Sequence, residues 1–140
     1  MKGFFNQILY VDLYCQKAEI KRVDPSVYQK FLGGKGLATW LLTELNPPGI
    51  DPLSPENRLI FATGAVTGTI TWGSSRYGVF TKSPLTGLYA ESYSGGKVPE
   101  AICATGFDAI VIHGRAEGLT LMEITPEGAF FHDAGHLAGK

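Results

Sequence analysis

The residues best suited to chemistry lie between Ala62 and Gly96, where a long loop of glycine and hydroxyl residues is followed by a single arginine, Arg76. Loops in compact domains commonly have about 4–6 residues, so the run from Thr63 to Ser75 is long. Small side chains let the backbone approach a bulky ligand, and a guanidinium can hold an anion through two hydrogen bonds. The stretch therefore suggests a large anionic ligand. The alternative for Arg76 is a strand-end arginine that pairs with an acid or lies in water.

Two further glycine clusters are candidates for anion contacts. Ser94-Gly95-Gly96 precedes a predicted helix, where unpaired backbone N–H groups can bind phosphate, although an ordinary tight turn is the alternative. Gly33-Gly34-Lys35-Gly36 interrupts a helical pattern, which predicts a break in the helix or a close backbone contact. We include Gly34 and Lys35 among the candidate contacts, against the alternative of a solvated lysine. The cluster matches neither the Walker nor the Rossmann spacing.

The remaining titratable residues do not form a recognisable catalytic set. The histidines have no metal or triad spacing, and the cysteines have no CxxC partner: His113, His132, His136, Cys15 and Cys103. Asp108, at the start of an apolar run, is expected to be a cap or turn residue rather than a catalytic acid. The sequence thus predicts a binding platform without a nucleophile or acid–base pair of its own.

Composition excludes several classes of partner. The 140 residues suffice for one domain, with 44% hydrophobic and 18% charged residues. The net charge is −1 and no basic run occurs, which argues against nucleic acid and anionic membranes as partners. No apolar stretch approaches the roughly 20 residues that span a bilayer, and the start does not read as a signal peptide. We expect a cytoplasmic protein.

Hydrophobic periodicity and turn residues outline the elements that must position these groups. The sequence predicts strands over 4–13, 18–23, 58–62, 77–82, 88–91, 108–113, 119–124 and 129–131. It predicts a helix capped by Asp24, broken at 33–36 and resumed to Leu45, and a second helix over 98–104. Few helices and short connections indicate an α+β fold with mostly antiparallel strands. The two halves share a strand–helix–strand rhythm, compatible with an internal duplication. The tail from His132 to Lys140 is expected to lack a closing strand or helix, as in a chain cut within a domain.

Six ordered segments give the chain a family resemblance. They are ILYVDL, KFLGGKGLATWLL, DPLSPENRLIFATGAVTGT, SSRYGVFTKSPLTG, SYSGG and GFDAIVIHGRAE. Together they cover nearly the whole chain, which resembles the N-terminal domain of the aldehyde ferredoxin oxidoreductases. These enzymes hold tungsten or molybdenum between two pyranopterin dithiolenes. The resemblance implies an α+β domain, residues 1–140, whose glycine-rich loops form the base on which the cofactor sits.

The resemblance also implies roles for individual residues. Arg76 would reach the phosphate region of the cofactor, and Tyr93, Ser94, Gly95 and Gly96 would contact the pterin and a bridging magnesium ion. Better-known members have asparagine where this chain has Tyr93, so a contact through the main-chain carbonyl would survive and one through a side-chain amide would not. Two further departures are Ala65-Val66, where proline-leucine is usual, and the bulky Trp72.

The activity implied by the resemblance is oxidation of aldehydes to carboxylic acids, with electrons passed through a 4Fe–4S cluster to ferredoxin. The cluster cysteines, the acid–base residues and the remaining pterin contacts would lie in later domains, so no activity is expected from residues 1–140 alone. A homodimer is common in the family. Two alternatives stay open: a relative that reduces an aromatic thioester, and a stand-alone pterin- or nucleotide-binding module without catalysis.

Overall fold

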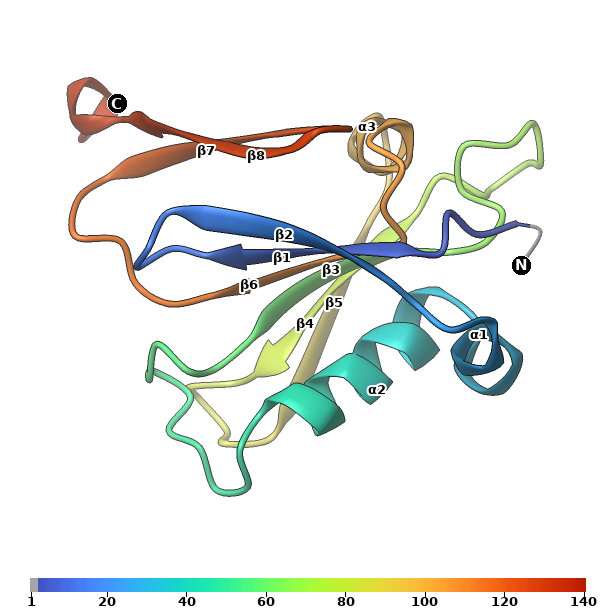
Figure 1. Ribbon diagram of the computed structural model, residues 1–140, viewed down its shortest axis with the longest axis horizontal. Coiled ribbons are helices and arrows are strands. Elements are labelled where there is room, and N and C mark those ends of the chain that lie inside the picture. The colour runs from blue at the N-terminus through green and yellow to red at the C-terminus, as the bar shows by residue number, and fades with distance from the viewer. Residues whose placement is uncertain (1–2) are drawn as a thin grey trace.

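The fold is organised around a six-stranded sheet in the computed structural model, which describes residues 3–140 (Figure 1). The strands are β1 (Gln7–Asp12), β2 (Lys17–Arg22), β3 (Leu59–Thr63), β4 (Tyr77–Lys82), β5 (Tyr89–Ser94), β6 (Ala109–His113), β7 (Thr120–Thr125) and β8 (Gly128–Asp133). The large sheet has the order β2-β1-β6-β3-β4-β5, and β7 and β8 form a separate hairpin. All neighbouring pairs are antiparallel except β1 and β6. The α+β class and the mostly antiparallel pairing are therefore confirmed.

The helices cover the two faces of the sheet unequally. They are α1 (Pro25–Phe31), α2 (Gly34–Leu45), α3 (Val98–Ala104) and a short 3-10 helix, η1 (Gly135–Leu137). Helices α1 and α2 lie on one face, and α3 with the β7–β8 hairpin lies on the other (Figure 1). Each face has its own apolar core. On one face Leu37 and Leu41 of α2 are buried with Phe80 of β4, and on the other face Leu9, Phe107 and Ile110 are buried beneath the hairpin. The sheet is thus held rigidly from both sides.

The start of α1 follows the cap predicted from sequence. The carboxylate of Asp24 accepts a hydrogen bond from the Ser26 N–H at 2.8 Å, and Pro25 occupies the first helical turn. Proline is favoured there because its missing N–H would have no helical partner.

The glycine cluster between α1 and α2 marks both a break and a close contact. Helix α1 ends at Phe31, Leu32 has a φ of 55°, and α2 begins at Gly34. A Cβ on Gly36 would lie 1.9 Å from the Phe31 carbonyl oxygen, which no side chain tolerates. A break between two helices is therefore confirmed, but it lies at Leu32 and Gly33, and residues 34–36 form the first turn of α2 instead of the predicted break. Gly36 is the residue that lets the two helices meet at this angle.

Several predicted boundaries were wrong: β1 begins at Gln7 and not at Phe4, and the C-terminal ends of β5 and β8 lie later than predicted. Strand β5 continues to Ser94 instead of ending at Glu91, because residues 92–94 pair with the start of β4. The tail was predicted without regular structure, yet β8 reaches Asp133 through its pairing with Thr120, and η1 follows. In both cases cross-strand pairing extended a segment whose own sequence reads as a turn.

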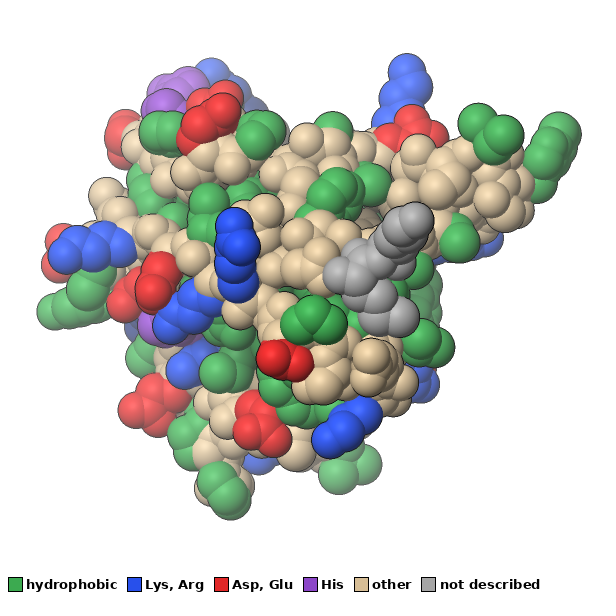
Figure 2. Space-filling view, turned by 45° about the vertical axis from the view of Figure 1, so that its right-hand side comes forward, with side chains coloured by type: hydrophobic (Ala, Val, Ile, Leu, Met, Phe, Trp, Pro, Cys, Tyr) green, Lys and Arg blue, Asp and Glu red, His purple; other side chains and the backbone are tan. Residues whose placement is uncertain are grey.

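The surface shown in Figure 2 mixes positive and negative side chains without a single-sign patch. This mixture agrees with the net charge of −1. Within residues 3–140, the longest helix is α2 with 12 residues, and none has the length and apolar character needed to cross a membrane.

Candidate functional site

The candidate site is a hollow of about 480 Å³ between the loop over residues 64–75 and the turn after β5. The loop projects from the end of the sheet at the upper right of Figure 1. Hydroxyl and glycine residues make most of the lining, and Arg76 and Glu100 are its charged members. The sequence-predicted residues Arg76, Ser94, Gly95 and Gly96 are all brought together here.

The pairing of β4 with β5 places the arginine beside the double glycine. Tyr77 lies opposite Ser94. Arg76 precedes Tyr77 and Gly95 follows Ser94, so these two residues are also neighbours across the strands. A Cβ on Gly95 would lie 3.1 Å from the Ser75 carbonyl oxygen and 3.8 Å from Cδ of Arg76. Gly96 has a φ of 81° with open space around it. The two glycines therefore permit a close approach that larger residues would block.

The guanidinium of Arg76 is exposed and makes no hydrogen bond or ion pair with residues 3–140. An exposed arginine among glycines and hydroxyls can form bidentate hydrogen bonds with phosphate. The carboxylate of Glu100, on the α3 side of the hollow, carries the opposite charge. Glu100 was not identified from the sequence, because nothing in its local pattern links it to Arg76.

Hydroxyl groups fix the shape of the loop from within. The Thr67 hydroxyl oxygen accepts a hydrogen bond from the Gly64 N–H at 3.2 Å. The same oxygen lies 3.1 Å from the carbonyl oxygen of Ser74 and 3.2 Å from that of Arg76. The Ser75 hydroxyl donates to the Gly96 carbonyl at 2.7 Å. Sequence reasoning missed both residues, because the run also contains Thr63, Thr69 and Thr71, and nothing in the pattern distinguishes Thr67 from them.

Lys35 and Tyr93 lie in a second group, on the α2 face of β5. The Lys35 ammonium contacts both carboxylate oxygens of Glu91, at 2.9 Å and 2.8 Å. The Tyr93 hydroxyl donates to the same carboxylate at 3.2 Å, and its ring meets Phe80 edge-on. The hydrogen bond with Lys35 lowers the pKa of Glu91, and the bond with Glu91 raises the pKa of Lys35.

We expect this exposed ion pair to contribute little to stability. Glu91→Gln should shift the midpoint of thermal unfolding only slightly near neutral pH, and the shift should vanish at about 1 M salt. Because the pKa of Glu91 is lowered, its contribution is complete above the ordinary value of 4.5 and is lost as the pH falls through the lower folded value. Glu44→Gln, an exposed change on α2, is the matched control. A large, salt-independent shift for Glu91→Gln alone would contradict this expectation.

Gly34 lies at the base of the loop and not in the hollow. A Cβ on Gly34 would lie 3.9 Å from the Thr63 carbonyl oxygen and from Cα of Gly64. The glycine turn between the helices therefore packs against the point where β3 enters the loop. Gly34 supports the loop from below, and its predicted cofactor contact is not part of the hollow that contains Arg76.

Asp108 anchors the chain beneath this loop. Asp108 is 5% exposed, and its carboxylate accepts hydrogen bonds from the Tyr28 hydroxyl at 2.6 Å and from three successive backbone N–H groups, residues 5–7. Its carbonyl accepts from the Thr63 N–H at 3.3 Å. Burial, followed by the bond to Asp108, raises the pKa of Tyr28. The sequence predicted a cap or turn residue, whereas the structure shows a buried carboxylate whose partners, residues 5–7 and Tyr28, are distant in sequence.

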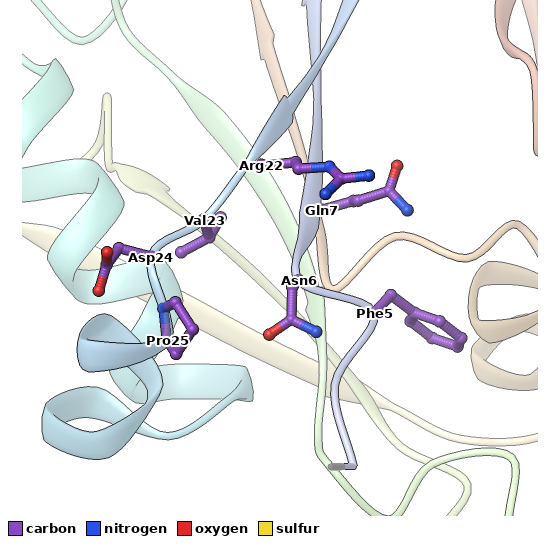
Figure 3. Close-up of a pocket in the computed structure, with 7 residues that line it drawn as sticks. All are labelled: Phe5, Asn6, Gln7, Arg22, Val23, Asp24 and Pro25. Atoms are coloured by element: carbon purple, nitrogen blue, oxygen red, sulfur yellow. The ribbon is translucent and has the colours of Figure 1, made fainter. Parts of the chain in front are cut away.

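A larger hollow, about 660 Å³, lies where β1 begins and β2 ends (Figure 3). Arg22 and Gln7 face each other in the strand register and extend to the same side, whereas the Asp24 carboxylate turns toward α1. None of the sequence-predicted contacts lines it. Volume alone does not make it the better candidate, because it lacks the glycine backbone and hydroxyl groups that surround Arg76.

The remaining expectations concern metals, cysteines and Trp72. No group of three histidine, cysteine or acidic side chains that could hold a metal occurs in the part of the chain that the structure describes. Cys15 is exposed, and Cys103 is partly buried with its thiol donating to the Thr67 carbonyl at 3.2 Å. Burial raises the pKa of Cys103, and Asp108 adds to this rise. Trp72 is 100% exposed and outside the lining, so its bulk does not fill the hollow.

The hollow thus fits the phosphate end of a large anion. It combines an unpaired guanidinium with hydroxyls and a glycine turn that leaves open space, and a metal bound nearby would need ligands from elsewhere.

Hydrophobic side chains also protrude at the upper right of Figure 2, where the loop projects in Figure 1, and Ile70 and Trp72 of this loop are fully exposed.

Comparisons with known proteins place this geometry in context. Residues 8–140 match the family described as aldehyde ferredoxin oxidoreductase, N-terminal domain. The chain is 40% identical over 140 residues to the tungsten-containing aldehyde ferredoxin oxidoreductase of Pyrococcus furiosus, covering 100% of this chain and 23% of that protein. It is 30% identical over 137 residues to the WOR-like subunit of an aliphatic sulfonate oxidoreductase from the same organism, covering 96% of this chain and 22% of that protein.

A solved structure matches equally well. The active-site complex BamBC of benzoyl coenzyme A reductase, in complex with 1,5-dienoyl-CoA, aligns with a TM-score of 0.95 at 36% identity. The alignment covers 99% of this chain and 21% of that one. The chain therefore spans less than a quarter of the length of each of these relatives.

Proposed function

Because the chain belongs to the aldehyde ferredoxin oxidoreductase family and matches its N-terminal domain, we propose that it forms part of the binding site for a tungsten bis-pyranopterin. The observation that carries the proposal is the hollow in which the unpaired Arg76 faces Gly95 and Gly96. The Pyrococcus furiosus relative at 40% identity is named as tungsten-containing, which supports tungsten over molybdenum.

In this proposal Arg76 neutralises phosphate charge at the end of the cofactor. The guanidinium has no competing partner among residues 3–140, so binding breaks no existing ion pair. Lys35 is a weaker candidate for the same role, because it would have to leave Glu91 at 2.8 Å. Gly95 and Gly96 supply backbone that a large ligand can approach closely.

The main-chain carbonyl of Tyr93 would help to hold a magnesium ion bound with the cofactor. The Tyr93 ring lies on the α2 face, where its hydroxyl bonds Glu91, whereas Ser94 lies on the other face beside the hollow. The replacement of asparagine by tyrosine is then tolerated, because only the carbonyl oxygen is required.

The bound cofactor would supply the redox chemistry, a two-electron oxidation of an aldehyde to a carboxylate with oxygen from water and electrons passed to ferredoxin. The residues of this chain would bind the phosphate end of the cofactor and orient it. The 4Fe–4S cluster would be held by residues outside this chain, since neither Cys15 nor Cys103 has a neighbouring ligand among the described residues. We place this chemistry in the cytoplasm.

A second function is favoured by the benzoyl coenzyme A reductase match, at a TM-score of 0.95 and 36% identity. The same cofactor platform would then serve reduction of an aromatic thioester. Aldehyde oxidation with ferredoxin and reduction of benzoyl coenzyme A, assayed on one anaerobic preparation, separate the two functions.

The test of the platform is the metal and pterin content of the natural protein purified anaerobically. We expect tungsten with about two pterins per metal, and we expect Arg76→Ala to lower retention about tenfold or more, because charge-assisted hydrogen bonds are lost. Arg76→Lys should retain an intermediate amount, since an ammonium lacks the bidentate geometry. Arg22→Ala, which removes the arginine of the other hollow, is the control. Full retention by Arg76→Ala would overturn the proposed role of Arg76. A natural protein with neither metal nor pterin would overturn the proposed function.

A further inference from the structure

We propose that Thr67 is the positioning residue that holds Arg76 in place for anion binding. The inference rests on the proposed function, and it assigns to Thr67 a task that is separate from contact with the ligand. Thr67 is absent from the lining of the hollow, so any effect it has on the ligand must pass through the backbone.

The Thr67 hydroxyl joins the two ends of the loop. The residue is 6% exposed. Its hydroxyl accepts a hydrogen bond from the Gly64 N–H and lies within 3.2 Å of the carbonyl oxygens of Ser74 and Arg76. One hydroxyl therefore connects the residue that opens the loop with the residues that close it. A buried hydroxyl that accepts one hydrogen bond and shares its proton between two carbonyl oxygens is costly to remove, because these contacts are lost together.

Thr67 is itself fixed from the side of α3. The Cys103 thiol donates to the Thr67 carbonyl at 3.2 Å, and the next residue, Gly68, has a φ of 78°. A Cβ on Gly68 would lie 2.7 Å from the Cys103 sulfur, so only glycine allows α3 to approach this closely. The hydroxyl is thus held at a defined place relative to the sheet before any ligand arrives.

The direction of Arg76 depends on this arrangement. Its guanidinium has no bond within the described residues, so the position of its backbone decides where the side chain reaches. The bond between the Arg76 carbonyl and the Thr67 hydroxyl fixes that backbone at 3.2 Å, next to the hollow. Loss of the hydroxyl would let the arginine sample positions that do not bind phosphate.

The experiment uses the natural holoprotein and measures the rate at which tungsten is released during anaerobic dialysis against a chelator. Thr67→Val keeps the shape and removes the hydroxyl, and Thr67→Ser keeps the hydroxyl. Thr63→Val is the matched control, because Thr63 is 5% exposed and its hydroxyl makes no hydrogen bond in the described part of the chain. Thr67→Ala repeats the test without a second methyl group if Thr67→Val fails to fold.

We expect Thr67→Val to release tungsten about tenfold faster, and Thr67→Ser and Thr63→Val to stay within about twofold of the unaltered protein. In an Arg76→Ala background, Thr67→Val should raise the rate of tungsten release by less than about twofold, because the guanidinium that Thr67 positions is already absent. Unchanged release by the hydroxyl-free variants, or their full effect in the Arg76→Ala background, would overturn the inference. Unchanged release by Arg76→Ala alone would instead overturn the proposed function.

Discussion

Asp108→Asn is expected to destabilise the protein by about 3 kcal/mol, because a buried carboxylate with four donors is replaced by an amide that can accept at only one atom. The Tyr28 hydroxyl and the backbone N–H groups of Asn6 and Gln7 all point at one oxygen, Oδ2, and the Phe5 N–H points at the other. An amide NH2 group at either place would face a donor. Urea unfolding followed by circular dichroism measures the change.

The control for Asp108→Asn is Asp24→Asn. Asp24 is exposed and caps α1 through one bond to the Ser26 N–H, and asparagine caps helices about as well as aspartate. The two variants carry the same chemical change, so only burial and the number of donors differ. Equal, small effects of both variants would contradict the account of Asp108 as the anchor beneath the loop.

Gly36→Ala is expected to destabilise the protein by about 3 kcal/mol or more, because the added methyl group would lie 1.9 Å from the Phe31 carbonyl oxygen. The obstacle is backbone, so no side-chain rotation relieves it, and α1 must move away from α2. Tyr28, the buried residue of α1, would then lose its place beside Asp108. The urea midpoint of this variant should fall strongly.

Gly118→Ala provides the comparison for Gly36→Ala. A Cβ on Gly118 would meet nothing within 4 Å, and its φ does not lie in the left-handed region. Alanine there should be neutral or slightly stabilising, since it restricts the unfolded chain. If Gly36→Ala were as stable as Gly118→Ala, the close helix contact would not exist in the protein.

Local patterns predicted most of the elements but not all of their ends. Asp24 with Pro25 identified the start of α1, and the turn before Tyr89 separated β4 from β5, because capping and turn chemistry act over a few residues. Tyr93 and Ser94 were placed outside the strand, since their membership of β5 depends on pairing with β4. Pairing energy comes from the partner strand and cannot be seen in a single segment.

The candidate site was predictable in part. Arg76 and Gly95-Gly96 were identified separately, and the register of two neighbouring strands brings them together. The pairing of Lys35 with Glu91 joins residues 56 positions apart, and the position of Thr67 depends on where the loop returns. Such contacts follow from the three-dimensional path of the chain. The family resemblance, confirmed over residues 8–140, supplied the ligand class that the residues alone left open.

The central claim is that Arg76 and the glycine turn hold the phosphate end of the cofactor. The most direct measurement is a crystal structure of the natural protein purified anaerobically with its cofactor. The account predicts a phosphate oxygen within hydrogen-bonding distance of the Arg76 guanidinium, with Gly95 and Gly96 against the same group. A bound cofactor whose phosphates lie elsewhere, with Arg76 left in solvent, would contradict it.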